Sequence, residues 1–310
     1  MTGHVNPVRT GPLAALRRQG HETLVEVTMR TIGRFLLARP LFTSCTGGGD
    51  TTAPTPDLLT VGSSASSAIL DAACGDVVAS NVRLESDLTC TGDGLTVTGT
   101  GITINLNGHS IAGAGVGVGI RVQSSQDVSV HGGTVRGFLQ GMFVAGSTGI
   151  VIKDNLFAEN ATAVLLQASS GNTIKANVAR GNTARAFMLR PNTAGVVSTN
   201  NDIVENTLID NPTGIYLIRQ PGNTFIGNSI SGSSVAAIDL DPAPLGASGN
   251  VFKGNLLETS GAGIRFADGW TGNTIHGNTI RLNTCAFQGP SAGNTLQGNT
   301  LTGNAADFCP

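Results

Sequence analysis

The stretch Gly214-Ile215-Tyr216-Leu217, followed by Gly222-Asn223-Thr224-Phe225-Ile226-Gly227-Asn228-Ser229-Ile230, decides the fold of this chain. The same order returns at Gly263-Ile264-Arg265-Phe266 and at Gly272-Asn273-Thr274-Ile275-His276-Gly277-Asn278-Thr279-Ile280. An apolar run, a Gly-Asn-Thr segment and a second Gly-Asn segment recur in this way through the later part of the chain. A unit this short cannot bury its apolar face without neighbours, so the repetition predicts a solenoid.

Strands are the expected building blocks because each apolar piece is only three to five residues long. The pieces alternate in polarity, are rich in Val, Ile and Thr, and are bounded by Gly, Asn and Ser, which is typical of strands and turns. Helices do not fit between those breaks, and the chain lacks the Leu-x-x-Leu-x-Leu frame of leucine-rich repeats. The sequence therefore predicts an all-β, right-handed parallel β-helix of about nine coils, with roughly 22 residues in each coil.

Asparagines recur at two fixed places in the repeat. One column contains Asn155, Asn177, Asn206, Asn228, Asn255, Asn278 and Asn299, and a second contains Asn160, Asn182, Asn211, Ser233, Ser260, Asn283 and Asn304. We expect the rungs to lie about 4.8 Å apart, so that the amide of one Asn bonds to the Asn of the next coil. We also expect these Asn residues to adopt left-handed backbone angles in tight bends. Both columns are therefore interpreted as structural.

Two spacings in the first column are longer than the others, with 29 residues between Asn177 and Asn206 and 27 between Asn228 and Asn255. The extra residues fall around 190–201 and 242–247, in both cases after the first strand of the coil. Loops grown from one corner of a solenoid are expected to wall a groove on that side.

Residues 1–57 contain no repeat and are interpreted as a signal and tether segment, removed or disordered, ahead of a β-helix domain at 58–310. A basic and apolar stretch that ends at Cys45 resembles a bacterial lipoprotein signal, with Cys45 as the acylated residue. Arg39 and Pro40 interrupt its apolar part, so lipoprotein export, ordinary export and no export all stay open. No stretch is apolar enough to span a bilayer, and any membrane attachment would use a lipid.

The other four cysteines flank the repeats, with Cys74 and Cys90 at the front and Cys285 and Cys309 at the rear. Pairing within each end predicts two disulfides and an oxidising, extracytoplasmic compartment: the periplasm, the cell surface or the medium. Reduced thiols in a cytoplasmic protein are the alternative, because spacing alone does not establish pairing.

Composition limits the partners. The chain has 18 Lys and Arg against 20 Asp and Glu, a formal net charge of −2, and no basic run, so nucleic acid is excluded as an expected partner. No His or Cys cluster has the spacing of metal ligands, so we expect no metal and no cofactor. Ca²⁺ is left open without a motif that supports it. We expect the protein to act as a monomer.

Several motifs at the start of the repeats match a known pattern: Cys74-Gly75-Asp76, Leu88-Thr89-Cys90, Gly92-Asp93-Gly94-Leu95 and Leu106-Asn107-Gly108-His109-Ser110-Ile111. This opening resembles bacterial right-handed β-helix proteins of the pectin-lyase-like superfamily, and the later coils resemble the repeats of NosD-like and carbohydrate-active proteins. The resemblance covers roughly residues 70–304. It implies a protein that binds or acts on polysaccharide outside the cytoplasm. Motifs of polygalacturonases or pectate lyases are not visible, so no catalytic residue is carried over.

The outward residues of the first strand in each coil form two columns. The first contains Arg121, Phe143, Leu165, Met188, Tyr216, Asp239, Arg265 and Phe287, and the second contains Gln123, Ala145, Gln167, Arg190, Ile218, Asp241 and Ala267. Asp239 and Asp241 are expected to point outward together. Tyr216 and Arg265 are expected one rung to either side of Asp239.

Two functions fit this strip. The first is an exported or surface-anchored β-helix protein that binds extracellular polysaccharide or has a structural surface role. The second is a lyase, hydrolase or epimerase acting on acidic sugars, with Asp239 or Asp241 as base or cation ligand. The residues expected to hold the sugar in either case are Arg190, Tyr216, Arg219 and Arg265. A simple surface ion pair between Asp239 and Arg265 is the alternative to both.

Overall fold

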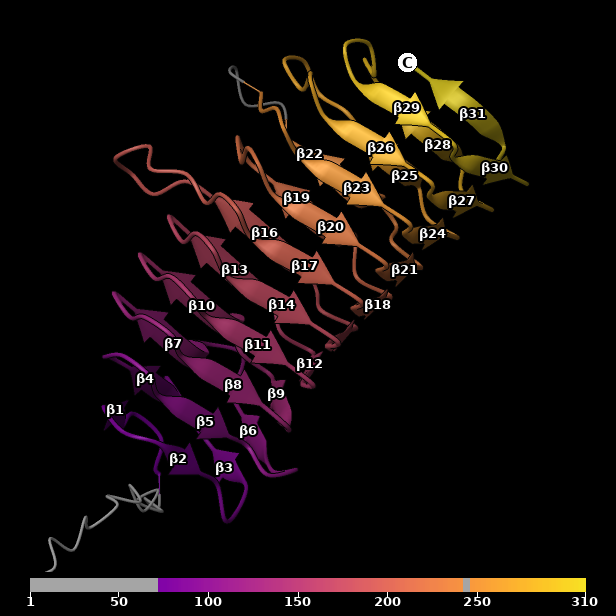
Figure 1. Ribbon diagram of the computed structural model, residues 1–310. Helices are drawn as coiled ribbons and strands as arrows, with labels where there is room; N and C mark the ends of the chain where they lie inside the picture. The colour runs from indigo at the N-terminus through magenta and orange to yellow at the C-terminus, as the bar shows by residue number, and fades with distance from the viewer. Residues whose placement is uncertain (1–71, 242–245) are drawn as a thin grey trace, which may run out of the picture. The chain divides into compact units, whose positions relative to one another are not determined.

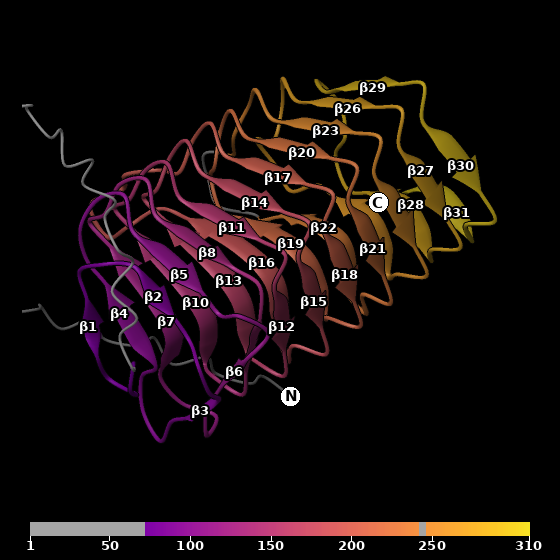
Figure 2. The ribbon, with the colours of Figure 1, turned by 60° about the horizontal axis from the view of Figure 1, so that its bottom comes forward.

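A computed structural model describes residues 72–241 and 246–310, which form a parallel β-helix. Each turn of the chain contributes one short strand to each of three parallel sheets, and the turns are stacked along one axis (Figure 1). Figure 2 shows the same stack turned by 60°, with the strands of each sheet in chain order. The predicted right-handed parallel β-helix is confirmed, with ten strands in two of the sheets where about nine coils were expected.

The three sheets together contain 31 strands. The first sheet contains β1 (Val77–Val78), β4 (Leu95–Val97), β7 (Val118–Gln123), β10 (Gln140–Ala145), β13 (Thr162–Gln167), β16 (Arg185–Arg190), β19 (Thr213–Leu217), β22 (Ala236–Leu240), β25 (Ala262–Arg265), β28 (Cys285–Gln288) and β31 (Ala306–Cys309). The second sheet contains β2 (Val82–Arg83), β5 (Thr103–Asn105), β8 (Ser129–His131), β11 (Val151–Lys153), β14 (Thr173–Lys175), β17 (Asp202–Val204), β20 (Thr224–Ile226), β23 (Val251–Lys253), β26 (Thr274–His276) and β29 (Thr295–Gln297). The third sheet contains β3 (Leu88–Thr89), β6 (Ser110–Ala112), β9 (Thr134–Arg136), β12 (Leu156–Ala158), β15 (Val178–Arg180), β18 (Thr207–Ile209), β21 (Ser229–Ser231), β24 (Leu256–Glu258), β27 (Thr279–Arg281) and β30 (Thr300–Thr302).

The core runs down the inside of the stack as columns of aliphatic and aromatic side chains. On the first sheet, Ile215 pairs with Ile238 and Ile238 with Ile264, and all three are fully buried. On the second sheet, the rings of Phe225 and Phe252 stack with their centroids 4.8 Å apart. Because like residues lie above one another, each turn covers the apolar side chains of the turn before it.

The Asn columns occupy the corners between sheets, as predicted. In the first column each side-chain amide donates to the Asn Oδ1 of the next turn, at 2.9 to 3.2 Å. The second column forms the same amide bonds from Asn160 to Asn211 and from Asn283 to Asn304, whereas at Ser233 and Ser260 the backbone N–H donates to the side chain of the next turn. A third ladder, not identified in the sequence, contains Asn172, Asn201, Asn223, Asn250, Asn273 and Asn294.

The expected backbone conformation of the ladder residues was wrong by one position. The left-handed residue is the one immediately before the Asn: φ is 54° at Ala176, 55° at Glu205 and 64° at Gly227, ahead of Asn177, Asn206 and Asn228. The preceding residue makes the sharp bend, and the buried Asn side chain then points along the stack to reach its neighbours.

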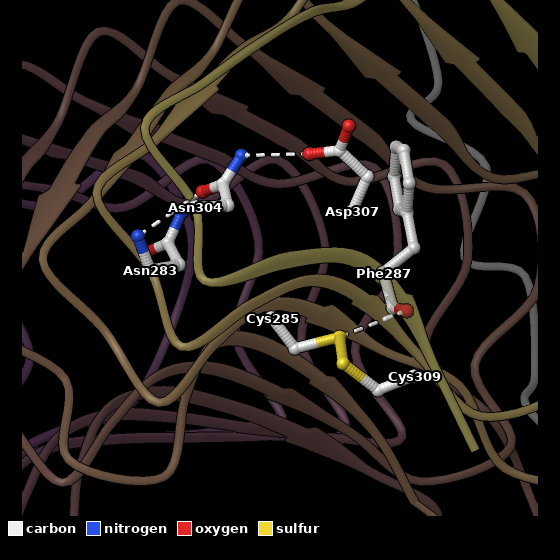
Figure 3. The surroundings of a disulfide bond; sticks show 6 residues. All are labelled: Asn283, Cys285, Phe287, Asn304, Asp307 and Cys309. Carbon is white, nitrogen blue, oxygen red and sulfur yellow. Dashed lines mark hydrogen bonds between the residues drawn. A yellow bond between two sulfur atoms is a disulfide. The ribbon is translucent and has the colours of Figure 1, made fainter.

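Both predicted disulfides are present. Cys74 bonds to Cys90, with the Cα atoms 5.5 Å apart, and Cys285 bonds to Cys309, with the Cα atoms 6.2 Å apart. The rear disulfide joins the last two strands of the first sheet (Figure 3). Beside it, the side-chain amide of Asn283 donates to Asn304 in the last turn of the second ladder.

One assignment in the outward columns needs correction. Phe287 pairs with Ile264 and Phe308, lies in the core and is 2% exposed. The outward residue on that rung is Gln288, which pairs with Arg265. The error arose from an offset of one residue in the last complete turn.

The two insertions lie where the spacings placed them. The first is the segment between β16 and β17, which extends beyond the neighbouring turns in Figure 1, and the second lies between β22 and β23. Cys45 and the expected domain boundary at residue 57 lie outside the described residues. Within the described ranges, no helix is long and apolar enough to cross a membrane.

Candidate functional site

The strip of outward residues on the first sheet has the register that the sequence predicted. Tyr216 on β19 pairs with Asp239 on β22, and Asp239 pairs with Arg265 on β25. Met188 on β16 continues the column on the other side of Tyr216. Four successive rungs therefore place a thioether, a phenol, a carboxylate and a guanidinium in one line.

Asp239 is fully engaged by Arg265. Its two carboxylate oxygens accept hydrogen bonds from Nε of Arg265 at 2.8 Å and from Nη2 at 2.5 Å. The Asp239 side chain is 3% exposed, whereas that of Arg265 is 39% exposed. The hydrogen bond from Arg265 to Asp239 raises the pKa of Arg265, and the charges of Asp239 and Asp241 act in the same direction. Asp239 therefore orients Arg265 and is not accessible as a base.

Asp241 is partly buried where the strip meets the second insertion. Its backbone carbonyl accepts a hydrogen bond from Nε1 of Trp270 at 2.8 Å, and Trp270 is itself 1% exposed. This bond ties the end of β22 to the connection that follows β25. The carboxylate of Asp241 adds its charge to the environment of Arg265.

Arg185 is a site residue that the sequence analysis missed. It begins β16, and its guanidinium carbon lies 4.2 Å from the ring centroid of Tyr216 on the next rung, a cation–π contact. Arg185 lies three residues before Met188, outside the two columns that were considered. Only the outward residues next to the core pairs of each first strand were considered from the sequence, and Arg185 lies before them.

A hollow of about 330 Å³ lies beside this contact on the first sheet. Leu165 and Met188 line it, and both are largely buried although they belong to the outward column. Arg185 and Arg190, at the two ends of β16, line the same hollow. The structure thus brings Arg190 together with Met188 and Arg185, next to Tyr216.

Arg219 belongs to a different hollow. A space of about 300 Å³ is lined by Arg219, by Gly195 and Val197 of the first insertion, and by Gly246 and Ala247 after the second. This hollow lies beside the first insertion, on the side where a groove was expected, and Arg219 lines it apart from the Tyr216 strip.

A larger hollow, of about 750 Å³, lies along the third sheet and is lined by Leu156, Val178 and Arg180 among others. A smaller one of about 310 Å³ adjoins it at Arg180 and is lined by Glu159 and Asp210. Glu159 and Asp210 occupy left-handed corner positions, with φ of 58° and 54°. Such corners recur along the stack, so the repeat itself accounts for the position of Glu159 and Asp210. The arginines of β16 lie within a strand, and the corner geometry does not explain their position.

Residues 86–300 match the family described as "Periplasmic copper-binding protein (NosD)". The chain belongs to the NosD family. No sequence among the curated proteins matches this NosD protein. Its periplasmic family and its two disulfides agree with an extracytoplasmic location.

Several solved structures have a fold similar to that of this chain. The A-module of the mannuronan C-5 epimerase AlgE6 of Azotobacter vinelandii is 17% identical, with a TM-score of 0.57 over 77% of this chain and 78% of that chain. The Dettilon tailspike protein gp208 is 16% identical, with a TM-score of 0.54 over 73% and 59% of the two chains. The AlgE4 A-module is 12% identical, with a TM-score of 0.51 over 76% and 79%. At these identities the likeness establishes the fold alone.

The donors in the described part of this NosD protein do not fit a copper site. Copper in proteins is held by imidazole, thiolate or thioether groups that converge on one point. His131 and His276 lie far apart on the second sheet, each flanked by a Lys in its column, and His109 contacts Asp87 at 3.3 Å. The four cysteines form disulfides. Among the described residues no group of three His, Cys, Asp or Glu side chains is placed to hold a metal ion.

Proposed function

We propose that this NosD protein binds polysaccharide outside the cytoplasm, as a monomer, with the outward face of the first sheet as its binding surface. The observation that carries the proposal is the partly exposed ring of Tyr216, held under the guanidinium of Arg185 beside the hollow lined by Leu165 and Met188. An aromatic face, apolar side chains and fixed hydrogen-bond donors are the groups that recognise the two faces and the hydroxyls of a sugar ring.

The stacked rungs suit a linear polymer, because equivalent outward residues repeat every 4.8 Å or so along the axis. Met188, Tyr216 and the Asp239–Arg265 pair lie on consecutive rungs of one column. A chain of sugars lying along this column would meet a different side chain at each rung. We place binding ahead of catalysis because Asp239, one of the two expected bases, is occupied by Arg265.

The test is binding to a panel of acidic and neutral polysaccharides, measured by calorimetry, with products of cleavage or epimerisation monitored in the same mixtures. Tyr216→Leu is the informative variant, because Leu165 already occupies the same column. We expect it to weaken binding up to about tenfold through loss of the aromatic face. Arg136→Gln, on the exposed third sheet, is the matched control and should bind normally. The proposal would be contradicted if the folded wild type bound no polysaccharide, or if the Tyr216→Leu variant bound polysaccharide as tightly as the wild type.

We also propose that Cys45 is the acylated first residue of the mature protein and that the residues after it, up to about residue 57, form the tether. The support is the basic and apolar order of the sequence before Cys45. Mass spectrometry of protein extracted from membranes should find a lipid-modified peptide that begins at Cys45. A mature protein that retains an unmodified Cys45 would rule out the anchor.

A further inference from the structure

Two arginines on one strand have buried donors without partners. Among buried side-chain nitrogen and oxygen atoms of residues 72–241 and 246–310, three lack a hydrogen-bond partner: Nε of Arg185, Nε of Arg190 and Oγ of Ser233. Folded proteins leave few such groups unpaired, because each forfeits its hydrogen bonds to water. Arg185 and Arg190, which carry two of these three atoms, line the same hollow on the first sheet. This coincidence points to a ligand.

Other arginines of the described turns show what these two lack. Arg121 pairs with Asp93, Arg281 with Glu258 and Arg265 with Asp239. Within the described ranges no carboxylate forms an ion pair with Arg185 or Arg190. The cation–π contact of Arg185 with Tyr216 leaves the Nε–H of Arg185 without a hydrogen-bond partner.

The Arg265–Asp239 pair supplies the template for the missing partner. There the carboxylate meets the guanidinium side-on and accepts from both Nε and Nη2. Once either side chain turns its Nε–H toward the hollow, a carboxylate in the same side-on position at Arg185 or Arg190 would satisfy that orphaned donor and one terminal N–H together. The planar fork of arginine matches a planar carboxylate in this way, whereas a neutral hydroxyl would satisfy only one donor.

We propose that the hollow between Arg185 and Arg190 is a subsite for one carboxylate-bearing sugar unit of an acidic polysaccharide, held through the Nε atoms of these arginines over Leu165 and Met188. This inference rests on the proposed polysaccharide-binding function and names the class of polymer. The volume of about 330 Å³ is at the lower end of the range for small-molecule sites, as expected for a single ring.

The experiment compares an oligogalacturonate with the same oligomer after its carboxyl groups have been reduced to alcohols, and adds an oligomannuronate and a sulfated neutral oligomer. Binding is measured by calorimetry for the wild type, Arg185→Gln, Arg190→Gln, Arg190→Lys and the control Arg136→Gln. We expect at least one of the two uronate oligomers to bind 10- to 100-fold more tightly than the reduced one, about the contribution of a charge-assisted bidentate pair. Both Gln variants should remove most of that difference, and Arg190→Lys should also lose affinity because lysine lacks the fork.

The outcomes separate the subsite from the proposed function. Equal binding of the acidic and reduced oligomers, still sensitive to Tyr216→Leu, would overturn the carboxylate subsite and leave polysaccharide binding in place. Failure of every oligomer to bind folded protein would overturn both. If Arg190→Lys kept full affinity, or if the sulfated oligomer bound equally well through the same arginines, the recognition would be simple charge attraction. Either result would overturn side-on carboxylate recognition. Thermal melts of every variant, with Arg136→Gln as reference, establish that folding is intact.

Discussion

The corners of the β-helix and the outer face of its first sheet share one spacing but use it differently. At the corners, the same side chain returns in turn after turn, as in Asn177, Asn206 and Asn228, and it bonds to the next turn in the same way. On the outer face, the residue changes at every rung, from Met188 to Tyr216 to Asp239. A position that repeats carries the stacking, and a position that departs from the repeat is available for recognition.

The two regions also differ in how their polar groups are satisfied. The side chain of Asn206 accepts from the backbone N–H and the amide of Asn177, and donates to Asn228 and to the carbonyl of Ile174. Arg185 and Arg190 on the outer face each keep an unpaired buried Nε. The side chains of the corner are therefore satisfied within the protein, whereas these two arginines on the outer face keep donors that the protein does not pair.

Breaking a corner should have the largest effect on stability. Asn206→Leu keeps the branch at Cγ but removes every hydrogen bond of the side chain to the neighbouring turns, and leaves the backbone N–H of Asn177 without its acceptor. We expect the free energy of unfolding to fall by about 2–4 kcal/mol, measured by urea denaturation. Gln297→Ala, at an exposed position on the second sheet, is the control and should change little. If Asn206→Leu lost no more free energy of unfolding than Gln297→Ala, the ladder would not stabilise the stack of turns.

Opening the rear disulfide should lower the stability by a comparable amount. The last turn has neighbours on one side within the described domain, and Cys285–Cys309 closes a loop of 24 residues across it. The double variant Cys285→Ala, Cys309→Ala should lose about 3 kcal/mol, the chain-entropy contribution of a loop of that length. Hydrogen exchange should show the loss first in β28 to β31. Uniform loss along all turns would instead indicate that the domain unfolds as one cooperative unit.

A smaller effect is expected from the ion pair on the outer face. Asp239→Asn leaves Arg265 without its carboxylate, but Arg265 is 39% exposed and water can replace part of the lost interaction. We expect a loss of about 1 kcal/mol in stability and a measurable weakening of polysaccharide binding as Arg265 loses its fixed position. Asp239→Asn binding with unchanged affinity would remove Arg265 from the binding surface.

The smallest effect concerns Asp87 near the front of the stack. A hydrogen bond from the backbone N–H of Ser110, with a smaller contribution from His109, holds the pKa of Asp87 below its usual value. A lowered folded-state pKa stabilises the protein above the unfolded-state pKa, and this contribution disappears as the pH falls through the folded-state value. Asp87→Asn should therefore melt slightly below the wild type at pH 7, with the difference vanishing in strong acid. A difference that persists in acid would have another origin.

The sequence predicted the register of the site but not the state of its side chains. Spacing alone placed Tyr216, Asp239 and Arg265 on adjacent rungs, because parallel pairing in a repeat leaves one register. Whether Asp239 faces a ligand or its neighbour depends on side-chain torsions that no periodicity encodes. Arg185 was missed for the same reason, since its reach to Tyr216 depends on side-chain direction rather than on its column.

The corners show the same limit at the level of the backbone. The Asn columns were visible, but the left-handed bend lies at the preceding residue, which is Asp154, Ala176, Glu205 or a glycine. The residue type at that position varies from turn to turn, because the turns share only its backbone conformation. A corner after the first sheet contains Ser125, Ser147, Ser169 and Ser198, where the backbone N–H of each of the first three donates to the Ser Oγ of the next turn, and this series was missed in the sequence.

The ladder bonds have a consequence for the size of the domain. Each Asn contacts the turn before it and the turn after it, and Asn206, Asn228 and Asn255 are interchangeable in that role. A barrel must keep its strand number in order to close, whereas this stack has no closure condition along its axis. Whole turns can be gained or lost while every remaining bond finds an equivalent partner. The number of turns therefore sets the length of the outer face, and that length can change without redesign of the core.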